Sequence, residues 1–215
     1  MKLLWIVPGF GEPYKKQKEH FFTENRKKIG RKIDIKIFEY NKENPGIVGQ
    51  FLKAHCHPWK VRDYDIILVS LDDVEFTSAI NWEQIQHYLY KDDWDMLLPS
   101  VANNNTVFPH IRTSALSEPI VQTTTAEFFC YFFKPKSYAT WWGYLRDYNP
   151  WLWGMDLNLH MNMLLKVGLM RDFTILHHYK GGSEAGSVDR VKYFEEMGVT
   201  MEQVAQQKCF LDELP

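Results

Sequence analysis

The chain has 215 residues, with 25 Lys and Arg against 27 Asp and Glu and a formal net charge of −2. This length fits a single domain spanning 1–215, or a piece of a longer chain, and the charge offers no broad basic surface for a nucleic acid. No apolar stretch is long enough to predict a membrane span. The widely separated Cys56, Cys130 and Cys209 form neither a metal-binding pair nor a disulfide framework, which favours a reducing, cytoplasmic compartment.

The first half of the chain alternates strand and helix patterns. Short apolar or alternating runs predict strands, and longer capped segments predict helices. The predicted strands are 3–7, 33–38, 65–70 and 95–98, and the predicted helices are 13–29, 46–55 and 81–90. This alternation predicts an α/β fold with a mixed, mainly parallel central sheet and helices on both faces. The basic residues between Lys15 and Lys32 are expected on the solvated face of a helix.

The second half of the chain is less regular. Strand patterns occur within 120–133 and at 173–176, and helix patterns occur at 135–146, at 156–167 and after Thr200. Glycines mark expected element ends: Gly30 should end the first long helix and Gly168 the helix at 156–167. Thr200 and Gln203 have the spacing of a capping box.

Two adjacent carboxylates, Asp72 and Asp73, follow the apolar run 66–69. Sheets of this kind bind ligands just beyond the carboxyl ends of their strands. Adjacent like charges repel unless a cation or water compensates them, and Mg²⁺ and Mn²⁺ prefer oxygen ligands. The pair is therefore a candidate metal site, and two solvated acids that cap a helix are the alternative.

A second candidate segment, His177-His178-Tyr179-Lys180-Gly181-Gly182, also follows a predicted strand. A histidine can ligate a metal, and a lysine can neutralise a diphosphate. Neighbouring glycines let backbone N–H groups approach phosphate oxygens. A surface turn with two ordinary histidines is the alternative.

Aromatic residues and acids form a third candidate group. Large aromatic side chains mostly fill cores, but they also stack on sugar rings. Asp156 can cap the helix predicted to follow it, or it can serve as a general base whose pKa is raised by nearby apolar surface. Glu127, in an aromatic segment, is a second acid that could take the same role. The clustered tryptophans are Trp141, Trp142, Trp151 and Trp153.

The segment Val7-Pro8-Gly9-Phe10-Gly11 follows the first predicted strand and is expected to end it. It can cradle a nucleotide or form only a tight turn, because it lacks the third glycine of the dinucleotide fingerprint. The chain has no P-loop, no nucleophile elbow and no HExxH motif, which excludes several common enzyme classes.

In combination, these motifs resemble those of GT-A-type, nucleotide-sugar-dependent glycosyltransferases. Leu71-Asp72-Asp73 resembles the DxD-type motif of that family, although many members carry an acid where Leu71 stands. His178-Tyr179-Lys180-Gly181 matches its late His-x-x-Gly segment. Trp153-Gly154-Met155-Asp156 is similar to its Trp-Gly-x-Glu-Asp segment, with one of the two acids missing. The whole chain is similar to chlorella-virus-encoded members implicated in building the capsid glycan.

The resemblance implies an enzyme that moves a sugar from a UDP-sugar to a glycan hydroxyl, with Mn²⁺ or Mg²⁺ as cofactor, in the host cytoplasm if the protein is viral. It implies that Asp73 and His178 ligate the metal and that Asp72 contacts the sugar nucleotide. It implies that Asp156 deprotonates the acceptor. The remaining implied contacts are Val7, Pro8 and Gly9 to the base, Lys180 and Gly181 to the diphosphate, and Trp151 and Trp153 to the acceptor sugar.

Two other classes stay open. A non-catalytic carbohydrate-binding module would use the tryptophans and need no metal. A metal-dependent phosphohydrolase would use the two aspartates with His177 and His178, but the sequence lacks the dense His/Asp cluster of two-metal sites.

Overall fold

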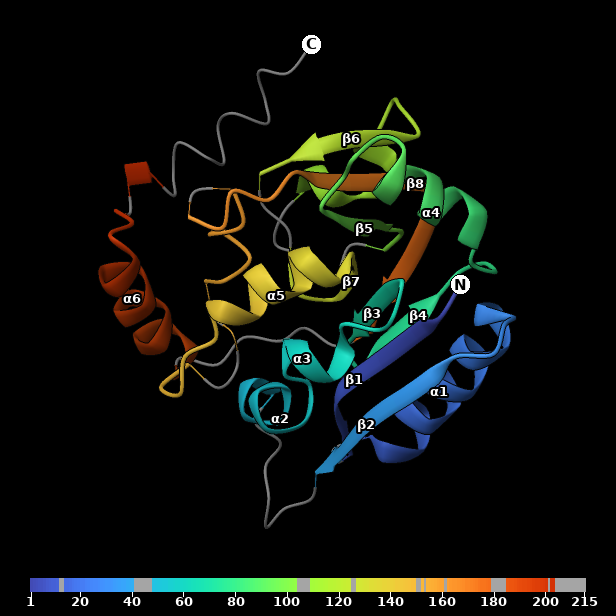
Figure 1. The fold of residues 1–215 in the computed structure, drawn as a ribbon, viewed down its shortest axis with the longest axis horizontal. Helices are drawn as coiled ribbons and strands as arrows, with labels where there is room; N and C mark the ends of the chain where they lie inside the picture. Colours follow the sequence, from blue (N-terminus) through green and yellow to red (C-terminus); the bar gives the residue numbers. More distant parts are fainter. Residues whose placement is uncertain are drawn as a thin grey trace.

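A central mixed sheet organises the protein, for which we analysed a computed structural model (Figure 1). The structure describes residues 1–11, 14–40, 48–103, 109–124, 127–149, 152, 154–160, 162–178, 185–200 and 202–203. Within these residues the sheet has eight strands in the order β2-β1-β3-β7-β5-β8-β4, and β6 pairs with β8. The strands are β1 (Leu3–Gly11), β2 (Asp34–Tyr40), β3 (Ile66–Ser70), β4 (Val74–Phe76), β5 (Met96–Val101), β6 (Ile120–Thr123), β7 (Cys130–Phe133) and β8 (Val167–His177).

Strand direction defines one functional edge of the sheet. β1 pairs in parallel with β2 and β3, and β5 pairs in parallel with β8. β7 lies antiparallel between β3 and β5, while β4 and β6 are antiparallel to β8. The carboxyl ends of β1, β3, β5 and β8 therefore meet at the edge where β7 begins. The predicted α/β fold with a mixed, mainly parallel sheet is confirmed.

Helices cover both faces of the sheet (Figure 1). On one face, Trp82 of α4 donates a hydrogen bond to the backbone oxygen of Ile29 in α1. On the other face, Tyr138 of α5 donates a hydrogen bond to the Cys56 oxygen, just after α2. The helices are α1 (Lys15–Ile29), α2 (Val48–His55), α3 (Pro58–Val61), α4 (Trp82–Tyr90), α5 (Pro135–Gly143) and α6 (Ala185–Met197), with short 3₁₀ turns η1 (Pro109–Ile111) and η2 (Thr113–Ala115). No helix among the described residues has the length and apolar character needed to cross a bilayer.

Burial of the central strands provides the main stabilisation of this sheet. All residues of β3, β5 and β7 are buried. Burial of one large apolar side chain contributes about 1.5–3 kcal/mol. The strands that apolar runs predict in the sequence are therefore the buried strands of the sheet, which helices cover on both faces.

Several local signals act as the sequence predicts. Gly30 ends α1 with a left-handed conformation. The Asn81 side chain accepts a hydrogen bond from the Gln84 N–H at the start of α4. Thr200 and Gln203 form the reciprocal bonds of a capping box, at 2.8 and 3.1 Å. The helix predicted beyond this box lies mostly outside the described residues.

The prediction that Pro8-Gly9-Phe10-Gly11 ends the first strand is wrong. β1 continues to Gly11, and Val7 and Phe10 pair with Ile37 and Glu39, so β1 has one extra residue opposite β2. This bulge uses Gly9, whose φ of +145° disfavours any residue with a side chain. A proline is tolerated here because a bulge does not need its missing N–H.

The helix predicted at 156–167 is also wrong. Residues 154–160 form turns, and β8 begins at Val167 and runs eleven residues. Gly168 lies inside this strand, where an added Cβ would be 2.7 Å from Ile120 Cδ1 and 2.9 Å from Leu97 Cδ2. The glycine therefore permits close packing of β8 against neighbouring side chains and does not end a helix.

We expect Gly168→Ala to lower the free energy of unfolding by about 1–3 kcal/mol, because overpacking a tight core forces side chains to shift. Gly143→Ala is the matched control, since a Cβ there meets nothing within 4 Å. Urea unfolding of both variants measures the difference. Equal stability of the two variants would contradict the close packing around Gly168.

Candidate active site

Asp72 and Asp73 lie in the turn between β3 and β4, here called the acidic turn. This turn lies beside the segment that precedes β7. Ser70 pairs with Cys130 across the two antiparallel strands. One residue further, the Leu71 N–H donates a hydrogen bond to the Phe129 oxygen at 2.9 Å. The Phe129 ring in turn stacks on His177, the last residue of β8, with 3.9 Å between ring centroids. Segments far apart in the sequence therefore converge at the carboxyl edge of the sheet.

Asp73 presents a half-satisfied carboxylate in this turn. Its Oδ2 lies 3.2 Å from Nε2 of His177. Its Oδ1 is buried and has no hydrogen-bond partner within the described part of the chain. Leaving a buried polar atom unpaired costs about 1–3 kcal/mol, and more when the group is charged. A cation or a ligand donor at Oδ1 would remove this cost.

His178 does not bring its imidazole to Asp73. Its backbone N–H donates a hydrogen bond to the backbone oxygen of Asp73 at 3.1 Å, but its Nε2 lies 3.0 Å from Oε2 of Glu75. Its ring stacks on Phe21 of α1 with 4.0 Å between centroids. Successive residues at the end of a strand point to opposite faces, so only one of the two histidines can face Asp73. The structure gives that position to His177, although the motif spacing favours His178.

Asp72 forms a buried ion pair that the sequence reasoning missed. Its Oδ2 lies 2.8 Å from Nζ of Lys18, and the two side chains are only 10% and 6% exposed. Lys18 is buried on the same side of α1 as Phe21, Asn25 and Ile29. The expectation that all basic residues of this helix face solvent is therefore wrong for Lys18. Its helical spacing from the two apolar residues was a signal that could have found it.

Helix α1 also fixes β4, the short strand that follows the acidic turn. The Asn25 side chain donates a hydrogen bond to the Val74 oxygen at 2.7 Å and accepts one from the Phe76 N–H at 2.8 Å. Lys28 lies 3.6 Å from the carboxylate of Glu75. Both ends of the acidic turn are therefore held against α1.

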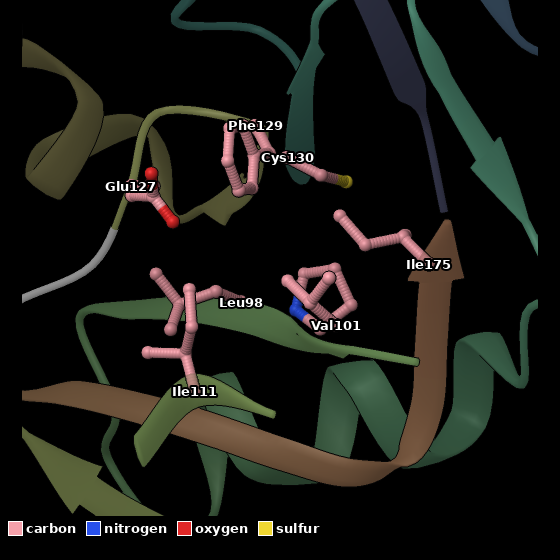
Figure 2. Close-up of a pocket in the computed structure, with 8 residues that line it drawn as sticks. Leu98, Val101, Ile111, Glu127, Phe129, Cys130 and Ile175 are labelled. Atoms are coloured by element: carbon pink, nitrogen blue, oxygen red, sulfur yellow. The ribbon is translucent and has the colours of Figure 1, made fainter. Parts of the chain in front are cut away.

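A second acidic region lies on the other side of Phe129. Glu127 and Phe129 line a small, mostly apolar pocket with Leu98, Val101 and Ile111 (Figure 2). Figure 2 shows that the glutamate comes from the segment before β7 and faces side chains from β5 and η1. The pocket therefore places the Glu127 carboxylate among mostly apolar side chains.

Asp156 belongs to this second region. Burial raises the pKa of its carboxyl to about 7, and the nearby negative charge of Glu127 adds to the increase. The Leu157 N–H donates a hydrogen bond to Asp156 Oδ1 at 3.0 Å, and this bond and the charge of Arg190 act in the opposite direction. At neutral pH a carboxyl with a pKa near 7 is partly ionised and can act as a base. It also binds the proton that it accepts more strongly than an ordinary carboxylate does.

The other predicted site residues divide into two groups. Val7, Pro8 and Gly9 lie at the end of β1, at the same edge of the sheet. Trp151, Trp153, Lys180 and Gly181 lie outside the described residues. Trp141 is fully buried and stacks on Phe128, and Trp142 donates a hydrogen bond from its indole to the Leu52 oxygen. Trp141 therefore belongs to the core, and Trp142 is partly buried against it.

The donor set fits a divalent ion only in part. No group of three or more His, Cys, Asp or Glu side chains able to hold a metal occurs among the described residues. Asp73 Oδ1 and the imidazole of His177 are hard and borderline donors of the kind that Mn²⁺ accepts. Substrate oxygens and water would have to complete the coordination, as is usual for ions that act on phosphates.

Comparisons with known proteins define the fold. No protein-family model matches the chain, and no curated protein matches its sequence. Among solved structures, A197 from STIV is 11% identical and superposes with a TM-score of 0.56 over 83% of this chain and 86% of that protein. GalNAc-T7, solved with UDP, GalNAc and Mn²⁺, is 12% identical, with a TM-score of 0.54 over 91% of this chain.

The chain spans about half of GalNAc-T7, since 48% of that protein is covered. At such low identities the similarity concerns the fold. The protein has a GT-A-like α/β fold.

The raised pKa of Asp156 predicts a pH-dependent stability. The folded-state pKa of about 7 lies above the ordinary value of 3.8. Between these pH values the folded state therefore binds the extra proton, and this contribution to stability is lost as the pH rises from about 4 to about 7. We expect wild type to lose stability relative to Asp156→Asn over this range, by at most about 4 kcal/mol.

Urea unfolding of wild type and Asp156→Asn at pH 5 and pH 8 measures this difference. The comparison cancels the pH dependence of the groups that do not interact with Asp156. A difference between the two proteins that does not change with pH would contradict the raised pKa.

Proposed function

We propose that this protein is a metal-dependent glycosyltransferase that moves a sugar from a UDP-sugar to a glycan hydroxyl. The observation that carries the proposal is the buried Asp73 Oδ1 beside His177, which has no hydrogen-bond partner among the described residues and lies at the carboxyl edge of a GT-A-like sheet. Ligands bind at this edge in open α/β sheets. The presence of UDP, GalNAc and Mn²⁺ in GalNAc-T7, which shares the fold, supports a nucleotide sugar and a metal.

In this proposal, Asp73 and one histidine hold the ion, and Asp72 stays beside the nucleotide as part of the acidic turn. A bound Mn²⁺ or Mg²⁺ would supply Lewis-acid stabilisation of the diphosphate that leaves. The sequence favours His178 as the imidazole ligand, whereas the distance of 3.2 Å to Asp73 favours His177. Val7, Pro8 and Gly9 would contact the base from the end of β1.

Asp156 is the proposed general base. Its position between apolar surface and Glu127 keeps its proton affinity high, so it can remove a proton from an acceptor hydroxyl at neutral pH. Glu127 keeps this affinity high by its charge and is the alternative base. The hydroxyl oxygen would then attack the anomeric carbon as the bond to the diphosphate breaks. A capsid glycan as the acceptor rests on the sequence resemblance to virus-encoded members of the family.

Asp73→Asn should abolish metal-dependent nucleotide binding, because the amide removes the charge that a cation needs. A thermal-shift panel of UDP, GDP, CMP and ADP, each with and without Mn²⁺, measures this, since a ligand raises stability only by binding the folded form. We expect wild type to respond selectively to UDP with Mn²⁺. Asp63→Asn, at a carboxylate that is 79% exposed, is the charge-matched control. An unchanged UDP response in Asp73→Asn would rule out the metal assignment.

The same assay separates the two histidines. If His177 is the ligand, His177→Gln should lose most of the Mn²⁺-dependent UDP response while His178→Gln retains it. The opposite result would assign the ligand to His178, as the motif spacing predicts. If both variants keep the response, neither histidine is a metal ligand.

Asp156→Asn should retain the UDP response and lose transfer, because only the proton acceptor is removed. We expect the rate to fall by about 10²–10⁴-fold, the usual contribution of general acid–base catalysis. The measurement is UDP release from UDP-sugars in the presence of a panel of glycan acceptors. Glu127→Gln tests the alternative base, and full activity in Asp156→Asn would exclude Asp156 from this role.

A further inference from the structure

The buried ion pair between Lys18 and Asp72 has a consequence for the acidic turn. Its two atoms are 2.8 Å apart, and both side chains are almost fully removed from solvent. Breaking such a pair by removing one partner leaves an uncompensated buried charge. Lys18 is therefore a fixed positive charge within the turn and not a surface lysine that can move away.

Further contacts of helix α1 also hold Lys18 in this position. Asn25, two turns further along the same helix, is bonded to the backbone of β4 on both its donor and acceptor sides. Phe21 stacks on His178 between these two contacts. The lysine is thus held by the packing of the helix as well as by its own ion pair.

The charges of the neighbouring groups show what Lys18 does. Of the two adjacent acids, Asp72 is neutralised by Lys18. Asp73 faces the imidazole of His177, and its other oxygen has no partner in the part of the chain that the structure describes. The next acid, Glu75, faces Lys28 and His178. The two carboxylates of the turn together with Lys18 therefore carry a net charge of only about one negative unit.

We propose that Lys18 is a positioning residue that lowers the affinity of the acidic turn for a free divalent cation, so that the ion binds together with a nucleotide diphosphate. A cation that approaches Asp73 alone is repelled by Lys18 and finds Asp72 already occupied. A diphosphate adds negative charge and oxygen ligands, which reverse this balance. This inference rests on the proposed function, and it concerns the order in which metal and nucleotide bind.

The test is a titration of the purified protein with Mn²⁺ alone, in which electron paramagnetic resonance measures the concentration of the free ion. Removing one positive charge close to a divalent ion changes its affinity by about tenfold or more. Lys18→Gln should therefore bind free Mn²⁺ at least about tenfold more tightly than wild type. Lys18→Arg keeps the charge and should behave as wild type.

Two further variants control this result. Lys27→Gln makes the same charge change on the same helix, at a side chain that is 67% exposed, and should leave the free-ion affinity unchanged. The double variant Lys18→Met with Asp72→Asn removes both charges of the pair, so that no carboxylate stays at position 72 without its lysine. Its affinity for free Mn²⁺ should be close to that of wild type. This variant keeps the inference testable if Lys18→Gln does not fold. A tenfold gain in its affinity for free Mn²⁺ would overturn the inference.

A merely structural role of Lys18 predicts the opposite sign, because a disordered turn would bind Mn²⁺ more weakly. Unchanged or weaker free-ion binding in Lys18→Gln would overturn the inference. If wild type still shows Mn²⁺-dependent stabilisation by UDP, the proposed function survives that result. Absence of any UDP response in wild type would overturn the proposed function and this inference together.

Discussion

The antiparallel pairing of β7 with β3 is the constraint on which the site depends. If β7 ran parallel to its neighbours, its amino end would lie at the opposite edge of the sheet. Because it is reversed, Ser70 pairs with Cys130, and the residues before β7 lie directly beside the turn after β3. This single reversal places Phe129 beside Leu71, at the start of the acidic turn, although more than fifty positions separate them in the chain.

The two sides of the site differ in how their charges are compensated. On the side of the acidic turn, each carboxylate faces a basic side chain: Asp72 faces Lys18, Asp73 faces His177, and Glu75 faces Lys28 and His178. On the other side, Asp156 and Glu127 repel each other in apolar surroundings, and the charge of Arg190 offsets this only slightly. In the first environment the acids have basic partners, whereas in the second the pKa of the Asp156 carboxyl is raised to about 7 by burial.

Much of the fold could be predicted from the sequence because its strongest signals are local. Apolar runs identify the buried strands, and Gly30 and Asn81 mark helix ends through their own backbone geometry and side-chain bonds. Gly168 misleads for the same reason. Its role depends on Ile120 and Leu97, which approach it from other strands, and nothing in its sequence neighbours reports this.

The site shows the same division between local and distant causes. The position of the acids after a buried strand could be predicted, because it follows from the order of residues along one segment. The choice between His177 and His178 could not, because it depends on which face of β8 meets the acidic turn. The partner of Asp72 was missed since Lys18 lies in a basic stretch, where composition suggests solvent exposure and only the helical spacing indicates burial.

The stacked rings of Phe129 and His177 have a geometric consequence for any reaction at this edge. They form a shared wall, 3.9 Å between centroids, with the acidic turn on the imidazole side and the Glu127 pocket on the phenyl side. The stacked rings therefore lie between two different electrostatic environments. In the function proposed above, a substrate that reaches from the cation at Asp73 to the proton acceptor would have to pass this aromatic pair.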